Sequence, residues 1–263
     1  GARQALDLIL DHLTQTAEAF DGGIRWHTPP EDLPTWQREL APEGYYNLGA
    51  AHGIPALITL LARCCQAGIR RPELQPIVDR AGTWVLAQRQ PQGFPSWVTP
   101  DAKRQEAQRL AWCYGDPGVA GTVLAASLAI GQATWQEQAL AIARHAAARD
   151  LEHAGLQDAG VCHGTAGLAH IFNRFYQATG CQTVGHAART WLAETLERRR
   201  PGQGLGGYQA WSLPPGQSGT EALTWIDQPG LLTGSAGIGL CLLAAVTPQE
   251  PAWDAALGLS APA

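Results

Sequence analysis

The sequence contains no methionine, not even at its first position, although it is 263 residues long. We therefore do not expect Gly1 to be a natural start, and we interpret the sequence as part of a longer protein. No uninterrupted apolar run of about 18 residues occurs, which argues against a membrane-spanning helix. The N-terminus lacks the charged and then apolar pattern of a secretion signal. These absences favour a soluble, cytoplasmic protein.

Basic charge is also scarce, since the net charge is −5 at pH 7 and no basic stripe is present. Proteins that bind nucleic acid usually carry such a stripe, so no nucleic-acid partner is expected. Alternation of apolar and polar residues at the spacing of a strand is nearly absent as well. This absence argues against a β or an α/β fold.

Six cysteines are present, and without an export signal they are better explained as thiols or metal ligands than as disulfides. Four of them lie in or beside apolar helical patterns, where we expect small buried residues. These four are Cys64, Cys65, Cys181 and Cys241. The other two, Cys113 and Cys162, each lie just ahead of a glycine turn.

Apolar residues recur at helical spacing along most of the chain. Amphipathic or helical patterns cover residues 3–20, 74–89, 134–149 and 183–198. Other helices, more uniformly apolar, are expected to follow four glycine turns and to end near residues 67, 130, 179 and 246. Three segments rich in glycine and proline, 21–47, 91–101 and 201–230, are expected to be loops.

The four turn glycines, Gly53, Gly115, Gly164 and Gly234, are spaced by 62, 49 and 70 residues. The helices that they open are rich in glycine and alanine and must be enclosed, whereas the amphipathic helices can face solvent. Such pairs can close into a ring with the apolar helices inside. We predict an all-α fold, an α/α toroid of inner and outer helices that is incomplete in this chain, with an open helical solenoid as the alternative.

Cys113, Cys162 and His163 are predicted to bind one zinc ion. If the inner helices begin at one end of the ring, side chains just before the turn glycines converge at one opening. Two thiolates and an imidazole suit zinc, and three protein ligands leave a fourth position for water or substrate. The glycine turn allows the backbone to bend between Cys162 and His163. This ligand set indicates a catalytic zinc, and the alternative is a coincidence of buried core residues.

His52 occupies the position equivalent to His163, directly before a turn glycine. An imidazole exchanges protons near neutral pH, so we predict that His52 is a catalytic acid or base. A structural histidine at a helix terminus is the alternative. Trp112 and Tyr114 flank Cys113 and are predicted to line the site, unless they are only packing aromatics.

Other polar residues have simpler expected roles. Asp116 is expected to stabilise the first turn of a helix. The arginines at positions 198–200 are expected to form a solvated helix end, with contact to an acidic peptide segment as the alternative. Four further histidines are expected to be surface or core residues, namely His145, His153, His170 and His186.

Taken in order, the motifs resemble those of the lanthipeptide synthetase C family, the zinc-dependent class I lanthionine cyclases typified by the nisin cyclase. The resemblance rests on Asn47-Leu48-Gly49-Ala50-Ala51-His52-Gly53, Trp112-Cys113-Tyr114-Gly115, Cys162-His163-Gly164 and Leu232-Thr233-Gly234-Ser235-Ala236-Gly237. These motifs spread over nearly the whole chain, which is similar to the C-terminal portion of a stand-alone cyclase. Residues 1–263 are therefore expected to form a single cyclase-like domain. The family fold has seven inner and seven outer helices, whereas about four pairs are visible here.

The resemblance also implies roles for individual residues. It implies that Cys113, Cys162 and His163 hold zinc and that His52 is an acid or base. It further implies that Arg109, together with Trp112 and Tyr114, lines the site. The family has another catalytic aspartate upstream of its first histidine motif, and this chain starts too late to contain it.

The implied function is that of a lanthipeptide cyclase, in which cysteine thiols of a peptide add to dehydroalanine or dehydrobutyrine and form thioether rings. In this reaction we expect His52 to protonate the resulting enolate and Arg109 or Tyr114 to stabilise its oxygen. The implied partners are a dehydrated precursor peptide, with leader and core, and a lanthipeptide dehydratase and transporter.

A non-catalytic binding module and a glycosidase are the two alternatives to a cyclase. A non-catalytic module could keep the zinc and only hold a thiol compound or a partner enzyme. A glycosidase with an α/α barrel would need paired carboxylates across its cavity. No inner-helix start in the sequence offers such a pair, so the glycosidase is not favoured.

Overall fold

A computed structural model describes residues 1–104, 109–149, 152–217 and 222–259. The helices of this part of the chain are α1 (Ala2–Thr16), α2 (Thr35–Leu40), α3 (Ile54–Gln66), α4 (Arg71–Ala87), α5 (Asp116–Ile130), α6 (Ala133–Ala147), α7 (Thr165–Thr179), α8 (Gln182–Glu197) and α9 (Ser235–Val246). Short 3-10 helices are η1 (Pro30–Asp32), η2 (Glu152–Ala154) and η4 (Ala252–Leu257). None of the helices described has both the length and the apolarity needed to cross a bilayer.

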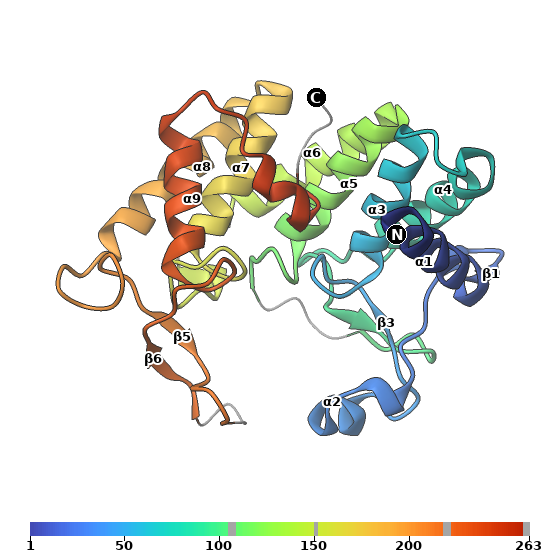
Figure 1. The fold of residues 1–263 in the computed structure, drawn as a ribbon, viewed down its shortest axis with the longest axis horizontal. Coiled ribbons are helices and arrows are strands. Elements are labelled where there is room, and N and C mark those ends of the chain that lie inside the picture. Colours follow the sequence, from blue (N-terminus) through green and yellow to red (C-terminus); the bar gives the residue numbers. More distant parts are fainter. Residues whose placement is uncertain (105–108, 150–151, 218–221, 260–263) are drawn as a thin grey trace.

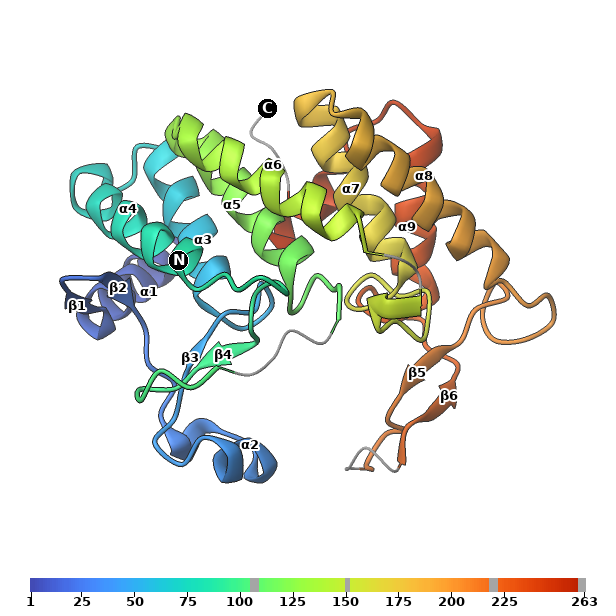
Figure 2. The same ribbon diagram turned by 180° about the vertical axis from the view of Figure 1, so that it is seen from behind.

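Helices α3, α5, α7 and α9 form an inner layer in which each packs against the next. Helices α4, α6 and α8 pack outside their preceding inner helices, and the view from behind shows them covering that layer (Figure 2). The inner helices run in the same direction and begin on the side where β3 (Tyr46–Asn47), β5 (Ala210–Ser212) and β6 (Thr224–Ile226) lie (Figure 1). This arrangement of inner and outer helices is the predicted α/α toroid, present here as part of a ring.

Burial explains why the two layers differ in sequence. In α5 all but two of the fifteen residues are buried, and the two exceptions, Leu128 and Ile130, are half-buried. A helix that is apolar all round is stable only when it is enclosed on every side. In the outer helix α4 the buried residues form one stripe that includes Leu74, Val78 and Val85. The other face of α4 is left to solvent.

The four turn glycines directly precede the inner helices, as the sequence predicts. We call the six residues before each of them a strap: 47–52, 109–114, 158–163 and 228–233. Each strap runs so close to its glycine that a side chain would not fit. A Cβ at Gly115 would lie 2.5 Å from the carbonyl oxygen of Arg109, and the φ of Gly115 is +108°. Glycine is therefore required where a strap turns into an inner helix.

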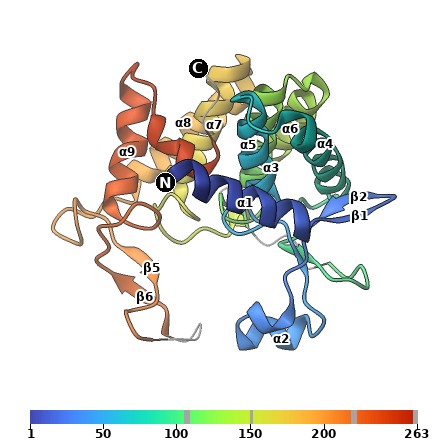
Figure 3. The ribbon, with the colours of Figure 1, turned by 45° about the vertical axis from the view of Figure 1, so that its right-hand side comes forward.

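Three small two-stranded antiparallel sheets lie in segments that were expected to be loops or the end of a helix. They pair β1 (Glu18–Phe20) with β2 (Gly23–Arg25), β3 (Tyr46–Asn47) with β4 (Trp97–Val98), and β5 (Ala210–Ser212) with β6 (Thr224–Ile226). Helix α1 ends at Thr16 rather than near residue 20 because the β1 strand then begins, with Glu18 opposite Arg25. The prediction of plain loops was wrong here, and Figure 3 shows β5–β6 and α2 below the inner helices.

The C-terminal segment is more than the short tail that the sequence suggested. After α9 the described chain forms η4, not a long outer helix, so three complete helix pairs are observed instead of about four. Trp112 donates its indole N–H to the carbonyl of Leu257 at 2.9 Å, and Arg63 donates to the carbonyl of Ala255. These bonds fix η4 against the inner helices.

A buried ionic cluster also holds the C-terminal segment to α7. Asp254 accepts contacts from His170 Nε2 at 2.9 Å and from Arg174 Nε at 3.0 Å. The His170 ring stacks on Trp253 with 4.7 Å between centroids, and Arg174 reaches Glu250 at 2.5 Å. We call these residues the α7 ionic cluster. His170 is thus a core histidine, as expected, with a carboxylate partner.

Candidate metal centre

Backbone hydrogen bonds between neighbouring straps bring the predicted ligands together. The N–H groups of Trp112 and Cys113 donate to the carbonyl of Cys162 at 3.0 and 3.3 Å, and the N–H of Cys162 donates to the carbonyl of Leu232 at 2.8 Å. We call this series the strap ladder. It joins positions that are equivalent in the repeat, two residues before each turn glycine. Cysteines 49 residues apart in sequence thereby become neighbours.

Cys113, Cys162 and His163 form one compact group at this ladder. One donor atom from each lies within 4.8 Å of the others, and among the described residues this is the one such group able to hold a metal ion. Tetrahedral zinc with Zn–S bonds of about 2.3 Å separates two sulfurs by about 3.8 Å. Cys113 is buried, whereas Cys162 and His163 are half-buried. The donors therefore fit zinc and retain a solvent-facing side.

The two thiols share a proton. A hydrogen bond from Cys162 lowers the pKa of Cys113 to about 4, and His163 and Arg109 favour the Cys113 thiolate further. The same hydrogen bond to Cys113 raises the pKa of Cys162. Loss of the first proton from the pair is thus favoured at Cys113. A divalent cation between them would take the place of the shared proton and hold both sulfurs as thiolates.

Arg109 lies beside Cys113, and its predicted role in lining the site stays a prediction. Its Nη2 donates to the Sγ of Cys113 at 4.0 Å, and its side chain is half-buried. As the first residue of the second strap, Arg109 occupies the position that Asn47, Asp158 and Gln228 hold in the other straps. Arg109 therefore brings a fixed positive charge to the edge of the sulfur pair.

Tyr114 is held by Asn47, a residue to which the sequence patterns assigned no role. The Nδ2 of Asn47 donates to the Tyr114 hydroxyl at 3.2 Å, while its Oδ1 accepts the N–H of Gly49 at 2.8 Å. Asn47 is only 5% exposed. Asp158 makes the same turn to Gly160, so extending the repeat alignment to the first strap position would have identified Asn47.

Burial raises the pKa of the Tyr114 hydroxyl above its usual value of 10. The phenol is therefore protonated at neutral pH. Because Asn47 donates to its oxygen, the hydroxyl hydrogen of Tyr114 remains free to point elsewhere. Tyr114 is thus prepared to donate a hydrogen bond into the site.

His52 and Trp112 differ in their surroundings. His52 is exposed and lies outside the group of three donors. Trp112 is buried, with its indole N–H bound to Leu257 in the C-terminal segment. Proton transfer by His52 and a lining role for Trp112 stay predictions.

Asp116 does more than stabilise a helix end. Its side chain makes no capping bond in α5. Instead its carboxylate accepts the N–H of Phe94 at 2.8 Å and contacts Nδ1 of His145 at 3.0 Å. Asp116 therefore joins three segments, and His145, which was expected to be an ordinary surface or core histidine, is its partner.

All six cysteines are free thiols, in agreement with the expectation that they form no disulfides. Cys64, Cys65 and Cys241 are buried, as expected for small apolar residues. Cys181 is not, because it is half-buried and its sulfur accepts a hydrogen bond from Arg144 at 3.3 Å. Its position directly before α8 places it at the helix end, outside the packed interior.

Comparisons with known proteins agree with this architecture. A family model described as Lanthionine synthetase C-like protein matches residues 3–257. The chain is 26% identical over 180 residues to "Nisin biosynthesis protein NisC" of Lactococcus lactis subsp. lactis, a match that covers 64% of this chain and 42% of that protein. The solved structure of a "Nisin cyclase" superposes with a TM-score of 0.70 at 22% identity, covering 96% of this chain and 60% of that one. The chain thus spans less than two thirds of either relative, and the structural likeness confirms the fold.

Proposed function

The chain belongs to the lanthionine synthetase C-like family, and from that premise we propose that it takes part in zinc-dependent cyclisation of a lanthipeptide precursor. The reaction is the intramolecular addition of a peptide cysteine thiol to dehydroalanine or dehydrobutyrine. The sulfur bonds to the β-carbon, the α-carbon takes up a proton, and a lanthionine or methyllanthionine ring results. The observation that supports this most is the convergence of the donors of Cys113, Cys162 and His163 within 4.8 Å.

Zinc held by these three residues would lower the pKa of a substrate thiol, so that the nucleophilic thiolate is present at neutral pH. Cys113 and Cys162 supply two negative charges to the site. These charges balance a divalent cation, and a third sulfur that joins them stays electron-rich. With two cysteine ligands, the bound substrate thiolate therefore stays nucleophilic and is not held too tightly to react.

The remaining residues have proton-transfer and electrostatic roles in the proposal. Tyr114 donates its free hydroxyl hydrogen to the enolate oxygen, and Arg109 supplies positive charge beside it. His52, exposed and able to reach solvent, donates the proton that the α-carbon receives. Trp112 lines the peptide path next to Cys113.

We further propose that residues 1–263 belong to one cyclase domain and that its substrate is a dehydrated precursor peptide with leader and core. A lanthipeptide dehydratase and a transporter would act on the same peptide before and after cyclisation. The exposure of His52, outside the donor group, is the one observation that favours the alternative of a zinc module that binds thiols without catalysis.

The test uses the purified chain with measured zinc content and a dehydrated peptide containing one cysteine. Cyclisation removes the free thiol without changing the peptide mass, so alkylation followed by mass spectrometry detects it. Cys113→Ala is expected to abolish stoichiometric zinc and ring formation, whereas the matched control Cys64→Ala retains both. The proposal is wrong if Cys113→Ala keeps both zinc and cyclisation. Stoichiometric zinc without ring formation in the unmodified chain would support the binding module.

A further inference from the structure

A cavity of about 340 Å³ lies next to the strap that carries two of the three metal-site residues. It is bounded by residues 157–159, by the residues at and after the end of α8, by the segment leading into β5, and by β6. Its lining includes Asp158, Arg198, Arg200, Tyr208, Gln209 and Trp225. A cavity of this size can take one or two amino-acid side chains.

One of the two arginines that line the cavity has no ion-pair partner among the described residues. Arg198 is paired with Glu194 at 3.0 Å, but the guanidinium of Arg200 donates only to backbone carbonyls, at 2.7 and 3.4 Å. Within the described residues no carboxylate pairs with Arg199 or Arg200. An arginine without an acidic partner retains donors suited to a carboxylate.

Asp158 does not cancel this charge in the way a free carboxylate would. Its side chain is buried, and its two oxygens accept the backbone N–H groups of Gly160 at 2.9 Å and Trp211 at 3.0 Å. These bonds anchor the strap to the hairpin. Asp158 thus has a structural role, and Arg200 is the group left to bind a ligand.

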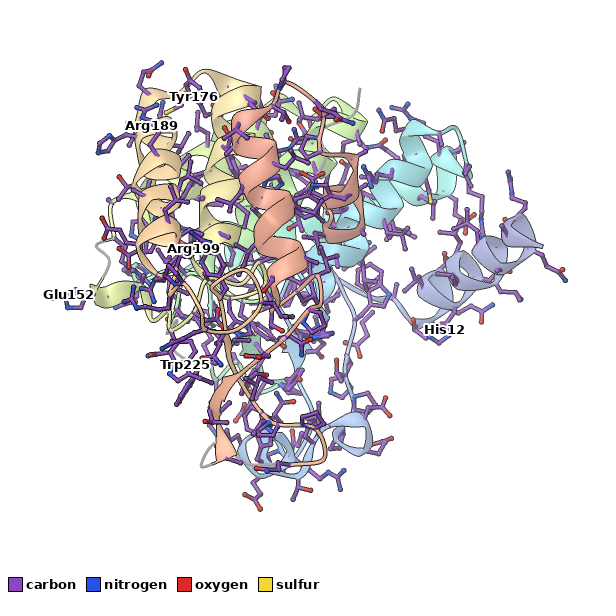
Figure 4. All side chains as sticks on the ribbon, turned by 60° about the vertical axis from the view of Figure 1, so that its left-hand side comes forward. His12, Glu152, Tyr176, Arg189, Arg199 and Trp225 are labelled. Carbon is purple, nitrogen blue, oxygen red and sulfur yellow. The ribbon has the colours of Figure 1, made fainter. Side chains whose placement is uncertain are left out.

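An exposed aromatic ring completes the cavity. Trp225 on β6 is 48% exposed and packs edge-on against Trp211, with 5.4 Å between centroids. Figure 4 shows Trp225 on the same side of the molecule as Arg199 at the end of α8. Exposed tryptophan next to arginine is a composition typical of the strongest contacts in peptide interfaces.

The cavity lies within reach of the metal centre. Asp158 is joined to the first turn of α7 through Thr165, whose N–H donates to its carbonyl at 3.2 Å. Only three residues lie between Asp158 and Cys162, so their Cα atoms, four steps apart along the chain, are at most about 14 Å apart. An extended peptide spans that distance with about four residues.

We propose that this cavity binds a carboxylate of the peptide substrate and thereby positions the reacting cysteine, a few residues away, at the metal centre. The inference rests on the proposed function for the identity of the ligand. It gives the arginines at 198–200 a role beyond that of a solvated helix end. Arg200 is the principal contact and Trp225 packs against the apolar part of the same segment.

The test measures the affinity of fluorescent peptides that contain neither cysteine nor dehydro residues, by anisotropy, on the zinc-loaded chain. One peptide carries Asp and Glu with an amidated C-terminus, the second carries Asn and Gln with a free C-terminus, and the third is neutral and amidated. Tight binding of the first or second assigns the carboxylate to a side chain or to the C-terminus. Equal affinity for all three overturns the proposal.

Variants at two arginines of the same region sharpen the result. Arg200→Glu is expected to weaken binding of the acidic peptide at least tenfold, whereas the matched control Arg189→Glu, at an exposed arginine within helix α8, changes it less than twofold. A peptide with Lys in place of Asp and Glu should bind Arg200→Glu better than the original chain. Tighter binding of the Lys peptide would show that the Arg200→Glu variant is folded. The proposal is overturned if the variant binds the Lys peptide no better and keeps its affinity for the acidic peptide.

The two proposals fail separately. The binding peptides have no thiol, so their affinity does not depend on ring formation. If Cys113→Ala cyclises peptides while Arg200→Glu loses the acidic peptide, the proposed function is wrong and the cavity assignment stands. If Arg200→Glu binds all peptides normally while Cys113→Ala is inactive, the cavity assignment is wrong and the function stands.

Discussion

Two histidines near helix α7 show how position decides what the same side chain can do. His163 lies just before the helix, beside two thiols and partly open to solvent. His170 lies seven residues later, within the helix, buried against Asp254 and stacked on Trp253. In the α7 ionic cluster the protein supplies the counter-charge itself. At the metal centre two thiols and an imidazole converge within 4.8 Å on a half-buried side of the fold, and this difference separates a structural cluster from a site that can take a ligand.

The largest effect is expected at the α7 ionic cluster. Asp254→Ala removes the buried carboxylate partner of Arg174, whose side chain is 8% exposed, and should lower the free energy of unfolding by about 3–5 kcal/mol. Zinc content of the protein that remains folded should not change. Urea denaturation and metal analysis measure the two quantities. Glu250→Ala is the control, because Glu250 contacts the same arginine from an exposed position and should cost about 1 kcal/mol or less.

The next effect is expected at His163. His163→Ala removes one of three donors and should weaken zinc binding about 100-fold or more, which corresponds to about 2.7 kcal/mol. The stability of the metal-free protein should change little, since the side chain is only half-buried. Competition with a chromophoric chelator gives the affinity. If His170→Ala lowers zinc affinity as much as His163→Ala does, the assignment of His170 to a purely structural cluster is wrong.

A smaller effect is expected at Asn47, which connects the first strap to the metal centre through Tyr114. Asn47→Ala removes the donor to the phenol and should lower kcat for cyclisation about tenfold, or about 1.4 kcal/mol, with zinc retained. Tyr114→Phe should be at least as slow. If Asn47 acts through the phenol, the double variant is no slower than Tyr114→Phe alone, and additive losses would assign Asn47 a separate role.

The smallest effect concerns Cys181, a thiol that belongs to neither cluster. Burial alone would raise the pKa of Cys181, but hydrogen bonds from Arg144 and from the backbone of Val184 and Thr183 lower it overall. More thiolate at neutral pH should make Cys181 alkylate several-fold faster than Cys64, whose pKa burial raises. Arg144→Gln should slow this reaction, as peptide mapping would show. Zinc content should be the same in Cys181→Ser, because a lowered thiol pKa without neighbouring donors does not make a metal site.

The sequence allowed the repeat and the donor group to be predicted because both depend on local constraints. Where a strap passes too close for a side chain, the sequence must contain glycine, as at Gly115 and Gly164, and this glycine can be recognised. Once the glycines are aligned, Cys113 and Cys162 fall at equivalent positions, and the structure brings them together. Their binding of zinc stays a prediction, but their proximity followed from the pattern.

Other contacts could not be predicted because they depend on how distant segments meet. His170 and Asp254 are 84 residues apart, and their pairing requires the path of the C-terminal segment between helices. The β5–β6 hairpin was missed because its two strands are short and lie in a segment whose glycine and proline content indicates a loop. Asn47 was missed for a different reason, since only the positions next to the turn glycines were compared.

The strap ladder has a consequence for anyone who redesigns or recombines these repeats. Because main-chain atoms of Cys113, Cys162 and Leu232 set the ladder, the spacing of the sulfurs is determined by the number of residues between each ladder position and its glycine. Adding a single alanine after Tyr114 would keep all three donors in the sequence but would displace Cys113 from its ladder position opposite Cys162. In a chimaera assembled from related repeats, loop length at this point therefore matters as much as ligand identity.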